Sequence, residues 1–507
     1  MSVKLLGIDV GTGGTRAVLI DGEGTIVASR TADHVPFASP ETGWAEQDPH
    51  DWWRATCRAV KQVLAASATD AADIAAVGFS GQMHGAVLLD AGGEVLRPAL
   101  IWCDQRSADA ARELTAQIGA GRIIEWTSNP ALPNFTLTKL LWVRKHEPAL
   151  FGRFRTLLLP KDYVRYRLTG EKGMDMADAS GTLLLDVAHR RWSREMANAA
   201  GLDPACLPPL FESPDVCAVI SEMGAAESGL KQGTPVVAGA GDQAAGAVGL
   251  GVVKPGAVHA TIGTSGVVFA ATDRPALDPQ GRLHSFCHAI PGRWHVMGVT
   301  QSAGLSLRWF RDTFGAKAGD SRDPYERLTE EAAAVPAGCD GVLWAPYLMG
   351  ERTPHLDPYA RAALIGLAAN HGRGHVIRAI MEGVAFSLRD SLSIFAEMNV
   401  PVERIRLGGG GGRSLLWRQI QADVFGRAVE TLQAEEGAAY GAALLAGVGA
   451  RVWSDADEAC QQAVRVGARI EPNPTIAAIM DRLYERYRRI YPALREIYPG
   501  TRSSAMV

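Results

Sequence analysis

The chain has 507 residues, with 51 Lys plus Arg against 55 Asp plus Glu, so its formal net charge is −4. This near-neutral balance argues against a nucleic-acid-binding protein, which normally carries a basic excess. No run approaches the roughly 18 apolar residues that a membrane-spanning helix needs. The N-terminal sequence has no apolar signal-peptide stretch, which favours a cytoplasmic protein. At about 100–200 residues per domain, the length predicts two or three domains.

The N-terminal part of the chain predicts strands joined by tight turns, followed by a helix. Asp48-Pro49 is a favourable helix start, because proline is tolerated in the first turn. Alternating and continuous apolar runs predict strands at Lys4–Asp9, Thr15–Ile20, Thr25–Arg30, Ile74–Ser80 and Ala86–Leu89.

The turn Gly11–Gly14, between the first two predicted strands, suits a phosphate group. Closely spaced glycines let backbone N–H groups approach an anion, Thr12 adds a hydroxyl, and Arg16 adds a guanidinium that can clamp phosphate oxygens. Asp9, at the end of the first strand, could hold Mg²⁺ through water. An ordinary hairpin turn with Asp9 as its cap is the alternative.

The same pattern returns about half the chain later. Gly263-Thr264-Ser265-Gly266 again lies between two apolar strands and is followed by a turn sequence. A repeat at this distance predicts two domains of similar build, which we assign to residues 1–244 and 245–507. Two such turns would grip one polyphosphate from both sides. Gly-Thr turns are common, so the alternative is that the two segments are similar by chance.

Five consecutive glycines, Gly408–Gly412, lie between a predicted strand and a predicted helix. A flat glycine surface that leads into a helix can accept the face of a nucleobase and ribose, with polar Ser414 at its edge. The alternative is a flexible linker, which is disfavoured because both flanking segments are strongly patterned.

Asp242 follows an apolar strand and a glycine bend, where an Ala/Gly-rich helix begins. It can be an N-cap, a general base, or both, and the helix start should keep it ionised.

Between two predicted strands, Gln82 and His84 could hydrogen-bond a polyol, with Met83 as an apolar wall. The alternative is that His84 is an ordinary loop histidine whose hydrogen bonds are all made within the protein. Residues 350–355 form a dense polar loop that could equally be a solvated turn.

Several segments together resemble the FGGY family of carbohydrate kinases, and among its members the xylulokinases. They occur in family order over nearly the whole chain: GIDVGTGGT, WAEQDPHDWW, SGQMHGAVLLD, VVAGAGDQAAGAVG, IGTSGVVFA, YLMGERTPH and GGGGRSLLWRQIQADVFG.

The resemblance implies an α/β fold with two actin-like (ribonuclease H-like) ATPase domains and a cleft between them. ATP would lie in the cleft with Mg²⁺, and the sugar mainly against the N-terminal domain. The family includes homodimers, so a homodimer is one expected assembly. The resemblance gives Asp242 as catalytic base and sugar contact and Asp9 as the residue near the metal. It places Met83, His84 and Gln243 at the sugar, Thr12, Arg16, Gly263 and Thr264 at the phosphates, and Gly409, Gly410 and Ser414 at the adenosine.

The implied reaction is ATP-dependent phosphorylation of D-xylulose at its 5-hydroxyl, giving D-xylulose 5-phosphate and ADP. Glycerol kinases carry Arg-Glu in place of Met83-His84, which favours a ketose here. Xylulokinases often have Asn where this chain has Gln243, which leaves another ketose or polyol (ribulose, L-xylulose or a sugar alcohol) as an alternative. An alternative from another class is a non-catalytic actin-like nucleotide-binding module.

Overall fold

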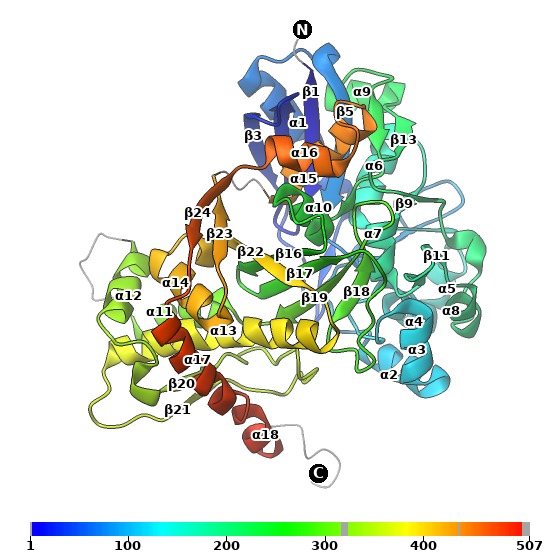
Figure 1. The fold of residues 1–507 in the computed structure, drawn as a ribbon. Coiled ribbons are helices and arrows are strands. Elements are labelled where there is room, and N and C mark those ends of the chain that lie inside the picture. The colour runs from blue at the N-terminus through cyan, green and yellow to red at the C-terminus, as the bar shows by residue number, and fades with distance from the viewer. Residues whose placement is uncertain (1–2, 316–322, 434–436, 499–507) are drawn as a thin grey trace.

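The computed structural model describes residues 3–315, 323–433 and 437–498, which form two lobes, each built on a seven-stranded sheet (Figure 1). We call the part around the sheet that contains β1 (Lys4–Val10) the first lobe, and the part around the sheet that contains β16 (Gly256–Ile262) the second lobe.

The first sheet has the order β13-β14-β5-β1-β2-β3, and the short β15 also pairs with β5. The four segments predicted at Lys4–Asp9, Thr15–Ile20, Thr25–Arg30 and Ile74–Ser80 form β1, β2, β3 and β5 to within three residues of their predicted ends, whereas β13 was not predicted. The strand bounds are β1 (Lys4–Val10), β2 (Gly14–Asp21), β3 (Ile26–Asp33), β5 (Ile74–Gly81), β13 (Val216–Val219), β14 (Pro235–Val237) and β15 (Ala240–Gly241).

The second sheet has the order β18-β19-β17-β16-β22-β23-β24. Its strands are β16 (Gly256–Ile262), β17 (Gly266–Thr272), β18 (His284–Cys287), β19 (Trp294–Thr300), β22 (Val402–Gly409), β23 (Val429–Leu432) and β24 (Val466–Ile470).

The two sheets repeat one topology. In the first sheet β1 is antiparallel to β2 and parallel to β5, and β5 is parallel to β14, which pairs antiparallel with β13. In the second sheet β16, β17, β22, β23 and β24 have the same order and directions. The duplication predicted from the two glycine turns is therefore confirmed, and so is the predicted α/β fold with two related units.

Alternate residues of the first sheet point into two different cores. Leu6 and Ile8 pack with α1 (Pro49–Ser67) and α6 (Pro160–Thr169). Leu5 and Val18 on the opposite face pack with α10 (Asp242–Gly249), α15 (Gly437–Gly449) and α16 (Ala456–Ala463). A face of the first sheet is thus covered by helices from late in the chain. The predicted boundary after residue 244 falls inside α10.

The second sheet is also covered on both faces. One face packs against α11 (Gly304–Phe314), α12 (Pro324–Ala333), α13 (Arg373–Glu397), α14 (Leu415–Phe425) and α17 (Pro474–Tyr487). The apolar residues of the other face share one hydrophobic core with four helices of the first half of the chain: α2 (Ala108–Ile118), α3 (Ala120–Thr127), α4 (Thr136–His146) and α8 (Arg194–Ala199). Each sheet therefore shares a core with the other half of the sequence.

Small residues allow α15 to lie directly on the first sheet and on α10. A Cβ atom on Gly7 would lie 1.9 Å from the carbonyl oxygen of Ala439, and one on Gly441 would lie 1.8 Å from the carbonyl oxygen of Ala245. The helix α15 lies against β1 and against α10, and α10 begins with Asp242 (Figure 1). This packing fixes the position of Asp242 relative to the sheet.

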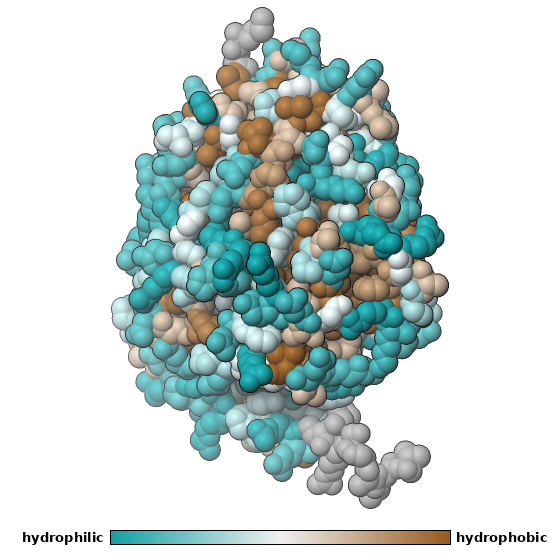
Figure 2. Space-filling view, turned by 90° about the vertical axis from the view of Figure 1, so that its right-hand side faces the viewer, coloured by the Kyte–Doolittle hydropathy of each residue, from teal (hydrophilic) through white to brown (hydrophobic). Residues whose placement is uncertain are grey.

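The outer surface differs sharply from these cores. Figure 2 shows hydrophilic residues over most of one face, with the hydrophobic ones in small groups between them. Among the described residues, we find no helix with the length and apolar character needed to cross a membrane.

Candidate functional site

Two aspartates lie at one edge of the first sheet because three strand ends are in register. Asp9 in β1 is paired with Ser80 in β5, and Ser80 is paired with Ala240 in β15. Neighbouring strands lie about 4.8 Å apart, so the backbones of Asp9 and Ala240 are separated by roughly two strand spacings. Asp242 follows β15 directly as the first residue of α10. Local turns and strand pairing thus bring together two acids that are far apart in sequence.

Burial raises the pKa of both aspartates, and the charge of Asp9 adds to the rise at Asp242. The pKa of Asp242 is raised to about 7, first by burial and then by the charge of Asp9, while hydrogen bonds from Gln243 oppose the rise. The sequence-based expectation that the helix start keeps Asp242 fully ionised is therefore incomplete, because desolvation and a like charge outweigh the helix dipole. The pKa of Asp9 is raised to about 6 by burial, against the opposing effects of Ser80 and Arg16.

Asp9 fits a role beside a metal ion. Its Oδ1 atom is buried and has no hydrogen-bond partner among the described residues, although a carboxylate oxygen in that position normally has one. Carboxylate oxygens and water are the ligands that Mg²⁺ prefers. The charge of Arg16 lowers the pKa of Asp9, and Nε of Arg16 donates to Ser29 at 3.1 Å. Arg16 therefore lies beside Asp9, and its predicted phosphate contact stays a prediction.

Side chains from distant segments brace the first glycine turn. Gln47 Nε2 donates to the carbonyl oxygen of Thr12 at 2.8 Å, and Trp102 Nε1 donates to the Thr12 hydroxyl at 2.9 Å. Gln82, only 1% exposed, donates from Nε2 to Gln47 Oε1 at 2.8 Å. Gln82 therefore supports the turn, and its predicted hydrogen bond to a polyol stays a prediction. The hydrogen bonds from Gln47 and Trp102 to Thr12 were not predicted, because nothing local in the sequence indicates these contacts.

The second glycine turn and the glycine-rich loop lie against each other. Ile262, before the turn, is paired with Gly409 in β22, and a Cβ on Gly409 would lie 2.7 Å from the Ile262 carbonyl oxygen. The turn itself is exposed at Gly263 and Thr264, whose carbonyl oxygens accept hydrogen bonds from the first residues of α11. A ligand at this edge of the second sheet could touch both segments.

The glycine-rich segment is ordered by the helix that follows it. Gly410–Gly412 form a short 3₁₀ helix, and Ser414 caps α14 by accepting a hydrogen bond from the Trp417 N–H at 3.3 Å. Ser414 therefore has a structural role at the helix N-terminus. Its predicted contact with adenosine stays a prediction.

Met83 and His84 lie beside the strand that precedes Asp242. A Cβ on Gly241 would be 2.8 Å from Met83 Cγ, so a larger residue there would displace the Met83 side chain. His84 Nδ1 lies 2.7 Å from the Gly181 carbonyl oxygen and must donate to it. Burial and the charge of Lys139 lower the His84 pKa to about 3. His84 is consequently neutral, and its Nε2 is a hydrogen-bond acceptor only.

A buried charge cluster lies behind these residues and was not predicted. Lys161 Nζ is 2.6 Å from Asp162, 2.5 Å from Asp175 and 3.3 Å from Asp178, and all four side chains are 0% exposed. A Cβ on Gly241 would lie 3.1 Å from Asp178 Oδ1. Burial raises the pKa of Asp178 well above its ordinary value. The cluster supports the backbone just before Asp242.

The predicted site residues therefore form two groups at the carboxyl ends of corresponding strands. The first lobe carries Asp9, Thr12, Arg16, Met83, His84, Asp242 and Gln243, and the second lobe carries Gly263, Thr264, Gly409, Gly410 and Ser414.

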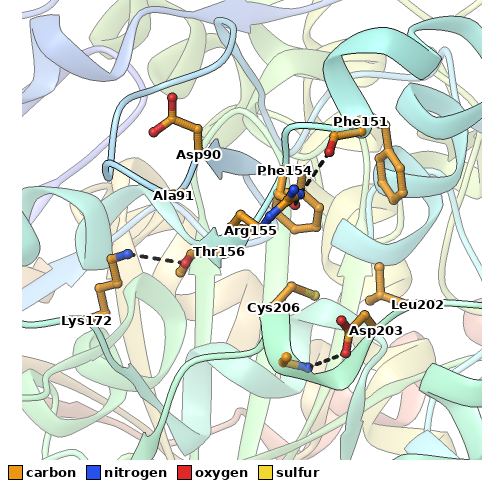
Figure 3. A pocket seen from close by; sticks show the side chains of 12 residues that line it. Asp90, Ala91, Phe151, Phe154, Arg155, Thr156, Lys172, Leu202, Asp203 and Cys206 are labelled. Carbon is orange, nitrogen blue, oxygen red and sulfur yellow. Dashed lines mark hydrogen bonds between the residues drawn. The ribbon is translucent and has the colours of Figure 1, made fainter.

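A pocket of about 630 Å³ lies elsewhere, among residues of the first half of the chain (Figure 3). Figure 3 shows Lys172 directed toward Thr156 and Asp203 bonded to the backbone of a short helix. None of the predicted site residues lines this pocket, so it plays no part in the site above.

Comparison with known proteins gives matches over both lobes. Residues 4–249 match the N-terminal domain of the FGGY family of carbohydrate kinases, and residues 258–450 match its C-terminal domain. The xylulose kinase of Bacillus subtilis (strain 168) is 38% identical over 96% of both chains, and that of Escherichia coli (strain K12) is 41% identical over 88% of this chain and 90% of its own. The crystal structure of xylulose kinase from Rhodospirillum rubrum superposes with a TM-score of 0.90 at 32% identity, covering 97% of this chain and 99% of that one.

Proposed function

We propose that this chain, which belongs to the FGGY family of carbohydrate kinases, uses ATP to phosphorylate D-xylulose at its 5-hydroxyl, giving D-xylulose 5-phosphate and ADP. The observation that carries the proposal is identity of 38–41% to two xylulose kinases over most of the chain. The paired carboxylates of Asp9 and Asp242 at one sheet edge supply groups that such a reaction needs.

Asp242 would act as the general base. The sugar hydroxyl oxygen attacks the γ-phosphorus, the bond to the bridging oxygen of ADP breaks, and the hydroxyl proton passes to the Asp242 carboxylate. Most of the catalysis in such a transfer comes from positioning and charge stabilisation. Asp9 would hold Mg²⁺ directly or through water, and the bound ion would offset the negative charge of the phosphates.

The remaining residues would bind the two substrates. We assign the phosphates to the two turns, with Thr12, Arg16, Gly263 and Thr264, and the adenosine to the loop with Gly409, Gly410 and Ser414. Met83 would provide an apolar wall for the sugar, His84 an acceptor for a sugar hydroxyl, and Gln243 a hydrogen bond beside Asp242. We also propose residues 1–244 and 245–507 as the two domains.

A coupled assay of ADP release over a sugar panel tests this function. We expect the highest kcat/KM with D-xylulose, and lower values with D-ribulose, L-xylulose and xylitol, because each alternative misplaces or lacks a group that the site contacts. A higher kcat/KM with one of these sugars would replace D-xylulose as the substrate. ATP binding without sugar-stimulated ADP release would instead indicate a non-catalytic nucleotide-binding module.

The reaction should depend on pH through Asp242. Its raised pKa of about 7 means that the carboxyl is protonated, and unable to accept a proton, at lower pH. We therefore expect kcat/KM for Mg–ATP, measured at saturating D-xylulose, to level off above about pH 7 and to fall about tenfold per pH unit below it. The fall should steepen below about pH 6, where Asp9 also takes up a proton. This parameter reports the enzyme before the nucleotide and its metal arrive. A constant value down to pH 5.5 would contradict the raised pKa.

A further inference from the structure

The polar loop at residues 350–355 is fixed at the carboxyl end of β19. Glu351 accepts hydrogen bonds from the Thr300 hydroxyl at 2.5 Å and from the Gln301 N–H at 3.0 Å. Thr353 N–H donates to the carbonyl oxygen of Val299 at 3.0 Å. The loop is therefore held by the second lobe on both sides of Arg352, and it is not a free solvated turn.

The side chain of Arg352 extends toward the proposed sugar-binding residues of the first lobe. Its Nη1 donates to His284 Nε2 at 3.1 Å. The His284 ring lies 5.6 Å from the Phe135 ring, and Phe135 lies 5.1 Å from the His84 ring. The charge of Arg352 also contributes to the lowered pKa of His84. Arg352 thus lies close enough to His84 to affect its pKa, although it belongs to the second lobe.

The guanidinium has hydrogen-bonding capacity that the described residues do not use. Among these residues none accepts a bond from Nε or Nη2 of Arg352, and none forms a salt bridge with it. Its sequence neighbour Glu351 is engaged by Thr300 and Gln301. Burial lowers the Arg352 pKa to about 10, and His284 is neutral because burial lowers its pKa well below 6.5. The unused nitrogens are absent from the buried atoms that lack a partner, so these donors reach solvent and can hydrogen-bond water or the oxygen acceptors of a ligand.

The chemistry of the proposed substrate supplies such an acceptor. A 2-ketopentose can close a furanose ring only through its 5-oxygen, so a ketose whose 5-hydroxyl attacks phosphorus must be acyclic. An acyclic ketose carries several hydroxyls, which both donate and accept, and one carbonyl oxygen, which only accepts. His84 Nε2 only accepts, whereas a guanidinium only donates. The two residues therefore suit different oxygens of one sugar.

We propose that Arg352 donates hydrogen bonds to the C2 carbonyl oxygen of the acyclic ketose, which makes it a residue that selects ketoses over polyols. This inference rests on the proposed function of the same site. It assigns a substrate contact to the second lobe, so the ketone would be held only when both lobes surround the sugar.

Comparison of D-xylulose with xylitol, in which the carbonyl is reduced to an alcohol, tests this contact. We would measure kcat/KM for D-xylulose and the inhibition constant of xylitol in wild type, Arg352→Gln and Arg352→Lys. Loss of a charge-assisted hydrogen bond should lower kcat/KM for D-xylulose about 10- to 100-fold in Arg352→Gln. The xylitol inhibition constant and the KM for ATP should change less than about threefold. Arg352→Lys should recover part of the loss.

The matched control is Arg361→Gln, because Arg361 is an exposed arginine of the same region that donates only to nearby backbone carbonyls. It should leave both parameters unchanged. Equal losses for D-xylulose and xylitol, or no loss for either, would overturn the role of Arg352 in recognising the ketone. Wild type that does not phosphorylate D-xylulose at all would overturn the proposed function, and with it this inference. If Arg352→Gln does not fold, the Arg352→Lys comparison decides by the same two readouts.

Discussion

Replacement of Asp242 by Asn should lower kcat by about 10²–10⁴-fold, because general base catalysis contributes about that much. The amide cannot accept the hydroxyl proton, yet it has the shape of the carboxyl group and can keep the hydrogen bonding with Gln243. Binding of D-xylulose should therefore change less than about threefold. Steady-state kinetics, together with calorimetric titration of D-xylulose, separate the two effects.

The matched control for this variant is Asp178→Asn. Asp178 lies directly behind Gly241, and it is one of three acids around Lys161. An amide has the shape of the carboxyl group, and Asp162 and Asp175 still pair with Lys161, so we expect kcat to fall less than about tenfold. If Asp242→Asn kept near-normal turnover, Asp242 would not be the base. If both variants lost activity equally, the loss would reflect a general sensitivity to substitutions near Gly241, and it would not identify Asp242 as the base.

Much of the site could be predicted because its signals are local. The turn at Gly11–Gly14 and the helix start at Asp242 follow from residue types in short segments. The duplication was also visible in the sequence, because the second turn repeats the first with its flanking strands. Strand register then places Asp9 opposite Ser80, as a parallel pair should.

The remaining features depend on contacts between distant segments. The raised pKa of Asp242 arises from burial and from Asp9, more than two hundred residues earlier. The hydrogen bond from Gln82 to Gln47 joins side chains 35 residues apart, and no local pattern indicates it. Arg352 occurs in a loop whose sequence alone reads equally well as a solvated turn. Local sequence patterns do not indicate which side chains come into contact between neighbouring strands or between the two lobes.

The close contact between α15 and α10 leads to the second large effect. Alanine at Gly441 should favour the helical conformation by about 1 kcal/mol, because glycine is a poor helix former. Its Cβ, however, would lie 1.8 Å from the Ala245 carbonyl oxygen and 2.9 Å from the Gly249 amide nitrogen. These are backbone atoms of α10, so the helices must separate. Overpacking of this kind costs typically 1–3 kcal/mol, and more where backbone must move.

We therefore expect Gly441→Ala to lower the melting temperature by several degrees, since the steric cost exceeds the gain in helix propensity. Because α10 begins with Asp242, a shift of this helix should also reduce kcat. The control is Gly121→Ala in α3, where a Cβ would have nothing within 4 Å. That variant should be unchanged or slightly more stable. Differential scanning calorimetry of both variants, with kcat measured in parallel, distinguishes the two mechanisms. If both glycines responded with the same sign, helix propensity would dominate, and the contact with α10 would not fix the position of Asp242.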